Sequence, residues 1–167
     1  MVSIDFTKLK TQYAKNYQQL DYLNIMPLYD YHPWDSGNNP NIDKITNTIL
    51  NLKTKKPEKF RFRDQAVNFF SKVMKTQLLG LNCANSKSFC VVPSHEKDKV
   101  CVGLLKLMDN LSADFGFINT NNLIRRTNTV AKAATGGDRS LQHHLNSLEV
   151  INVQHVHNQV IYLFDDI

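Results

Sequence analysis

Two adjacent carboxylates near the end of the chain, Asp165 and Asp166, occupy a position that indicates chemistry. They follow five consecutive apolar residues, Val160 to Phe164, which is typical of a parallel strand covered on both faces. Inside a sheet, neighbouring side chains point to opposite faces, so at least one of the two charges would be buried at high cost. Just beyond the carboxyl end of the strand, both can face one ligand, as is usual in open α/β sheets. A solvated acidic turn is the alternative interpretation.

The segments before this strand alternate between strand and helix patterns. Phe89 to Pro93 is a short run that is apolar on both faces, as a central parallel strand should be. We expect further strands at 115–118, 123–124, 149–156 and 160–164, and helices whose apolar stripes run from Val100 to Leu111 and from Leu141 to Leu148. This alternation predicts an α/β fold, a parallel sheet with helices packed on it.

The first half of the chain predicts helices. Apolar residues recur three or four positions apart over 6–20, from Asn41 to before Pro57, and over 64–79, where Gly80 stands at the stop position. We therefore divide the chain into a mainly helical N-terminal region, 1–84, and an α/β core, 85–167, within one compact domain.

Cations gather at the end of the second expected helix and in the segment between it and the third. They are Lys53, Lys55, Lys56, Lys59, Arg61 and Arg63. Cations are favourable at a helix C-terminus, which is the simpler explanation of the cluster. The stretch also has the composition of a nucleic-acid contact, so nucleic acid stays open as a partner. The formal charge of +5 favours anionic ligands but does not choose between a phosphate metabolite and nucleic acid.

The remaining composition narrows the class of protein. The three cysteines form no C-x-x-C pair, which indicates reduced thiols. No apolar run approaches the roughly 20 residues that a transmembrane helix needs, and the first residues carry an acid and no apolar signal segment. We expect a cytoplasmic protein with no membrane partner.

Four segments follow one another in a familiar order. They are Phe89-Cys-Val-Val-Pro-Ser94; Leu123-Ile-Arg-Arg-Thr127; Asp138-Arg-Ser140 with Leu145, Asn146 and Val150; and Ile161-Tyr-Leu-Phe-Asp-Asp-Ile167. In this order they resemble the type I phosphoribosyltransferases, and among these most closely the ComF-type competence proteins. The resemblance covers roughly residues 85–167. It implies a Rossmann-like phosphoribosyltransferase domain with a parallel sheet, over which the N-terminal helices form a hood.

The resemblance also implies a ligand, 5-phosphoribosyl-1-pyrophosphate (PRPP) with Mg²⁺. Asp165 and Asp166 would be the catalytic pair, holding the ribose hydroxyls directly or through the metal. The loop from Ser94 to Lys99 would face the pyrophosphate through backbone N–H groups at a helix start, with the cation Lys97 nearby. Three cations on the segment that ends at Gly136-Gly137 could close over the ligand: Arg125, Arg126 and Lys132. The reaction would be transfer of phosphoribosyl to an acceptor with release of pyrophosphate.

The family motif continues with Thr-Thr-Gly where this chain ends at Ile167. We therefore expect the domain to be C-terminally incomplete, which leaves activity open. The first hypothesis is a phosphoribosyltransferase, or glycosyltransferase of nucleotide metabolism. The second is a non-catalytic PRPP sensor or structural subunit, with a protein partner or as a homodimer, in bacterial DNA uptake or anti-phage defence. The third is a nucleic-acid-associated protein that uses the basic stretch 53–63.

Overall fold

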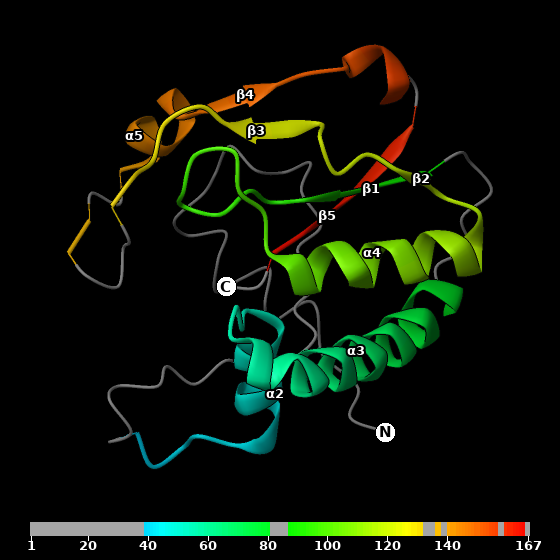
Figure 1. Cartoon of the computed structure of the whole chain (residues 1–167). Coiled ribbons are helices and arrows are strands. Elements are labelled where there is room, and N and C mark those ends of the chain that lie inside the picture. The colour runs from blue at the N-terminus through cyan, green and yellow to red at the C-terminus, as the bar shows by residue number, and fades with distance from the viewer. Residues whose placement is uncertain (1–38, 81–86, 132–135, 138–139, 157–158, 166–167) are drawn as a thin grey trace, which may run out of the picture. The chain divides into compact units, whose positions relative to one another are not determined.

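The structure is a computed structural model of the chain, and it describes residues 39–80, 87–131, 136–137, 140–156 and 159–165 (Figure 1). All of these residues belong to one compact unit of the chain, 31–167. The helix expected over 6–20 lies outside the described residues. Among the described residues, no helix is both long enough and apolar enough to cross a membrane.

The described elements have a mixed α/β architecture. The helices are α2 (Lys44–Leu52), η2 (Pro57–Lys59, a 3-10 helix), α3 (Phe60–Gly80), α4 (Val102–Phe115), α5 (Leu141–Asn146) and η4 (Val153–Val156, also 3-10). The strands are β1 (Lys87–Val91), β2 (Ile118–Asn119), β3 (Ile124–Arg126), β4 (Leu148–Val150) and β5 (Val160–Phe164).

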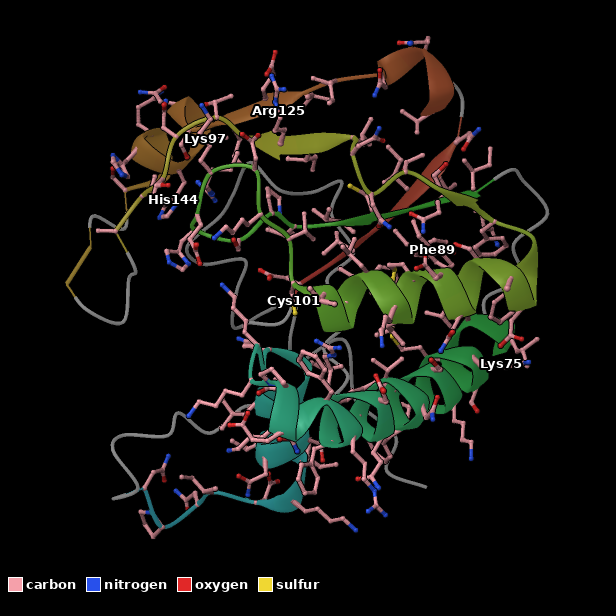
Figure 2. All side chains as sticks on the ribbon, viewed as in Figure 1. Lys75, Phe89, Lys97, Cys101, Arg125 and His144 are labelled. Atoms are coloured by element: carbon pink, nitrogen blue, oxygen red, sulfur yellow. The ribbon has the colours of Figure 1, made fainter. Side chains whose placement is uncertain are left out.

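A small parallel sheet has the strand order β2-β1-β5, with β1 in the centre. Phe89, Cys90 and Val91 of β1 are fully buried. Phe89 packs on the rings of Tyr162 and Phe164 in β5, at centroid distances of 5.8 and 5.3 Å, and Figure 2 shows it between the sheet and α4. The parallel sheet expected from the sequence, with β1 as its covered strand, is confirmed.

The expectation that β5 is covered on both faces is wrong. Among the described strands β5 lies at the edge of the sheet, and its side chains alternate. Tyr162 and Phe164 face the aromatic cluster, whereas Val160, Ile161 and Leu163 are 46, 41 and 53% exposed. The sequence of an apolar strand does not tell whether the strand lies at the centre or at the edge of a sheet. Its position depends on which other strands pair with it.

The strands expected at 123–124 and 149–156 do not join the parallel sheet. They form a separate antiparallel pair, β3 with β4, in which Ile124 lies opposite Val150. The second strand is also shorter than expected, because Asn152 has a φ of 56° and the chain then forms η4. At 115–118 the helix α4 continues to Phe115 and ends at Gly116, whose φ of 65° is left-handed, so β2 begins only at Ile118.

The long helices pack side by side and run in the same direction. Asp64 of α3 pairs with Lys106 of α4 at 2.9 Å, and at the other end Lys75 pairs with Asp114 at 3.1 Å. Consequently α3 and α4 both begin at the end of the unit where β1 leads into α4 (Figure 1). The C-terminal end of α2 lies at this end too, because the Cys101 thiol donates to the Leu52 carbonyl.

Other expected helix boundaries shift as well, and the helix expected from Asn41 to before Pro57 is the shorter α2, Lys44–Leu52. The third expected helix begins at Phe60, not at residue 64, because η2 with Pro57 at its start leads directly into α3. The helix expected from Asp138 begins at Leu141, where the Ser140 side chain accepts a hydrogen bond from the His143 amide.

The close contact of α2 with α4 predicts an unusual result at Gly103. A methyl group on Gly103 would lie 2.4 Å from the Leu52 carbonyl oxygen, so one backbone would have to move. We expect Gly103→Ala to lower the free energy of unfolding by about 1–3 kcal/mol in urea denaturation, as overpacking does. Helix propensity alone predicts the opposite sign, a gain of about 1 kcal/mol.

The comparison variant is Gly116→Ala, whose added methyl group would meet no atom within 4 Å. Only its left-handed φ is unfavourable for alanine, which costs roughly 1–2 kcal/mol. Equal or greater stability of Gly103→Ala than of wild type would contradict the packing of α2 on α4.

Candidate active site at the carboxyl edge of the parallel sheet

The carboxyl ends of β1 and β5 meet at one edge of the sheet. Val91 lies opposite Phe164, and the Val92 amide donates to the Phe164 carbonyl at 2.8 Å. Asp165 therefore leaves the sheet beside Val92. Val92 is two residues before Ser94, where the loop after β1 begins. Asp165 is exposed, and Asp166 lies outside the described residues.

The β1 loop, Ser94–Lys99, is closed by its own backbone and by the segment after β3. Five of its amides donate to acceptors in the protein: Ser94 to the Lys99 carbonyl (2.8 Å), Glu96 to Ser94 Oγ (3.3 Å), Lys97 to Thr129 Oγ1 (3.0 Å), Asp98 to the Arg126 carbonyl (3.1 Å) and Lys99 to the Glu96 carbonyl (3.3 Å). The sequence led us to expect this loop at a helix start. This expectation is wrong, because α4 begins only at Val102. An anion at this loop would therefore meet side chains.

The two acids of the β1 loop are paired with cations. Glu96 bridges two ammonium groups, with Lys55 Nζ at 2.8 Å and Lys99 Nζ at 2.6 Å. The hydrogen bonds from Lys55 and then Lys99 lower the pKa of Glu96 from 4.5 to about 2. Asp98 lies 4.0 Å from the Arg125 guanidinium. Repulsion of an anionic ligand by these acids is therefore largely offset.

Arg125 and Arg126, which the sequence could not tell apart, have different environments. Arg125 is exposed and pairs across the β3–β4 ladder with Glu149, at 2.6 Å. Arg126 is 5% exposed; its Nε donates to the Ser94 carbonyl at 2.6 Å and its Nη1 donates to Ser147 Oγ. Burial lowers the pKa of Arg126. Arg126 thus connects the β1 loop to Ser147, and Arg125 is the arginine of the two that solvent reaches.

Lys97 is exposed at the tip of the β1 loop and makes no ion pair with a described residue. Figure 2 shows Lys97 and Arg125 at the same end of the molecule, and the Asp98–Arg125 contact joins their segments. Of the predicted site residues, the structure brings Lys97 and Arg125 onto adjoining segments, and Ser94 follows Val92, whose amide binds the Phe164 carbonyl just before Asp165. Lys132 lies outside the described residues.

The cations of the basic stretch 53–63 have different surroundings. Lys55 is bound to Glu96, 41 positions away, and Arg63 is buried with its guanidinium 4.1 Å from the centre of the Phe60 ring. The sequence missed Lys55 as a neighbour of the β1 loop, and it included Lys99 only through the backbone of the loop. Lys55 stood out only as one of several cations, and nothing in the sequence linked it to residue 96.

Metal-binding groups are sparse in the described part of the chain. No cluster of three or more His, Cys, Asp or Glu side chains there could hold a metal ion. Mg²⁺ often keeps several waters and binds through substrate phosphates with one or two carboxylates. Asp165 fits such a site, in which the ligand supplies most of the oxygens.

The contrast between the two arginines predicts different effects on stability. Arg126→Met would leave the Ser94 carbonyl and Ser147 without their donor, which should cost about 2–4 kcal/mol in urea denaturation. Arg125→Met, the matched control, removes an exposed ion pair and should have a much smaller effect. Equal losses in the two variants would contradict the structural role of Arg126.

The Glu96 ion pairs predict a pH dependence. The folded-state pKa, about 2, is below the ordinary 4.5, so the pairs stabilise the fold above pH 4.5, and this contribution is lost as pH falls toward 2. Carboxyl NMR titration should place the Glu96 midpoint near 2, and Lys55→Met with Lys99→Met should raise it. Asp64, whose pKa Lys106 lowers, should be unchanged in that variant. A Glu96 midpoint near 4.5 in wild type would show that the pairs do not form in solution.

Comparison of the chain with protein-family models, with curated proteins and with solved structures finds no match. The function therefore has to be argued from the site itself.

Proposed function

We propose that the chain binds PRPP, or a closely related phosphoribosyl ligand, with Mg²⁺ at the carboxyl edge of β1 and β5. The observation that carries the proposal is the parallel pairing of these strands, which sets the β1 loop and Asp165 at one edge. Ligands of open α/β sheets bind outside the carboxyl ends of adjacent strands. The proposal also takes up the resemblance of 161–167 to the acidic motif of the phosphoribosyltransferases.

The charges at this edge suit a ligand with an acidic and a hydroxylated end. Asp165, together with Asp166, would accept hydrogen bonds from the ribose hydroxyls or hold Mg²⁺ against them. Lys97 and Arg125 would approach the pyrophosphate, and Ser94 would contribute its hydroxyl. Arg126 takes a changed role in this proposal: its burial makes it a positioning residue for the β1 loop.

The chemistry of such a site would be displacement at the anomeric carbon. An acceptor forms a bond to that carbon as the bond to pyrophosphate breaks, and pyrophosphate leaves with the electron pair. Protein groups would place the partners and stabilise the developing charge. The same binding without an acceptor would make the chain a sensor of PRPP.

The proposal predicts that Mg²⁺-dependent binding of PRPP depends on the acidic pair. Asp165→Asn with Asp166→Asn should weaken PRPP binding by about 10-fold or more in isothermal titration calorimetry, because hydrogen bonds to charged acceptors or to the metal are lost. Omission of Mg²⁺ should weaken binding to the wild type as well.

The matched control is Asp109→Asn with Asp114→Asn, which removes two exposed carboxylates from α4 and should leave PRPP affinity unchanged. Absence of PRPP binding to the wild type, or equal loss in both double variants, would overturn the proposal. If PRPP binds, release of pyrophosphate with a panel of bases and amines separates a transferase from a sensor.

A further inference from the structure

We infer that Glu96 occupies, in the ligand-free protein, the place on Lys55 and Lys99 that the pyrophosphate group of the ligand takes on binding. Binding would then exchange one anion for another on the same two ammonium groups. The inference rests on the proposed function, to which it adds two binding residues and an internal competitor.

The geometry of the three side chains is that of an anion site already filled. Each oxygen of the Glu96 carboxylate takes one ammonium, Oε1 from Lys55 and Oε2 from Lys99. The two lysines come from separate segments, one after α2 and the other at the end of the β1 loop. One carboxylate between two cations leaves a net positive charge, and Lys97 adds another cation in the same loop.

The backbone of the β1 loop leaves an anion few other contacts. The amides of Ser94 and of Glu96 to Lys99 already have acceptors in the protein, and Arg126 holds the Ser94 carbonyl. At Lys55 and Lys99, therefore, the loop gains an anion without refolding when these side chains change partners. Lys55 and Lys99 can do so by rotation of exposed side chains.

Exposure favours exchange in this direction. The Lys55 and Lys99 side chains are 75 and 59% exposed, whereas the Glu96 side chain is 29% exposed, so an anion from solvent reaches the ammonium groups. Exposed ion pairs are weak, and a carboxylate carries a single negative charge. A pyrophosphate carries several charges on oxygens that can contact both lysines together, so it should displace Glu96.

Competition by Glu96 would give the site selectivity. Anions with one charge, such as carboxylates, would have no advantage over Glu96 and would leave the lysines paired. Pyrophosphate and phosphate monoesters would compete successfully. The competitor would also weaken binding of inorganic pyrophosphate, which favours its release as a product.

The test measures the affinity of inorganic pyrophosphate, with Mg²⁺, by calorimetry on the full chain. Glu96→Gln should bind pyrophosphate about 3- to 10-fold more tightly than wild type, the range expected for release of two exposed ion pairs. Lys55→Met with Lys99→Met should bind it about 10-fold or more weakly. Acetate should bind none of these proteins measurably.

Two controls separate exchange from general electrostatics. Asp98→Asn removes the same charge from the same loop without freeing Lys55 or Lys99, and Arg125 keeps its closer partner Glu149. Asparagine tolerates the positive φ of 53° at that position. Asp114→Asn frees Lys75, which Figure 2 places at the end of α3 away from Cys101. Asp98→Asn should raise the affinity less than Glu96→Gln does, and Asp114→Asn should leave it unchanged.

The outcomes also distinguish the inference from the proposed function. If PRPP and pyrophosphate bind but Glu96→Gln and Asp98→Asn have equal effects, the inference fails and the proposed function stands. If Glu96→Gln tightens pyrophosphate binding but PRPP neither binds nor competes, the anion site stands and the proposed function fails. If no variant or wild type binds pyrophosphate, the inference fails whatever PRPP does.

Discussion

β1 and β5 come from distant parts of the chain, yet five residues of each lie in parallel register, from Lys87 opposite Val160 to Val91 opposite Phe164. The candidate site depends on this pairing, since it sets the end of β5 beside the start of the β1 loop. Parallel strands need a crossover between them, and α4 and the antiparallel pair β3–β4 belong to that connection. A shift of one residue would turn Tyr162 and Phe164 away from Phe89 and send Ile161 and Leu163 into the aromatic cluster.

The antiparallel pair β3–β4 holds the β1 loop through hydrogen bonds. Its Arg126 reaches the Ser94 carbonyl and Ser147, and its backbone accepts from Asp98. The α2 end of the chain contributes from the other side, through Lys55 on Glu96. Five backbone amides of the loop donate to acceptors in the protein, two of them outside the loop, so the loop presents mainly its exposed cations to a ligand. This division between internal backbone contacts and external side-chain contacts shapes both proposals.

Periodicity and composition were enough to predict the central features of the fold. The run from Phe89 to Pro93 predicted a covered parallel strand, and β1 is such a strand. The apolar stripe from Val100 to Leu111 predicted a helix, and α4 contains most of this stripe. The errors lie where one local pattern fits two tertiary settings. Val160 to Phe164 is a strand, but three of its five side chains are exposed, and it lies at the edge of the described sheet. The alternation after residue 148 predicted one strand where the chain forms β4 and then η4.

For the site, the sequence by itself determined which residue types stand at the ends of which segments. It placed an acid pair after an apolar strand, a short polar loop after another strand, and two arginines side by side. Only the tertiary structure decided that Arg126 is buried and bound to the Ser94 carbonyl, that Arg125 stays at the surface, and that Glu96 pairs with Lys55 and Lys99. The physical reason is that burial and ion pairing depend on which distant segments meet. Adjacent strand residues face opposite sides of a strand, so one of the two arginines had to face away from the other. The contacts of β3 with the β1 loop decide that Arg126 binds the Ser94 carbonyl and that Arg125 lies near Asp98.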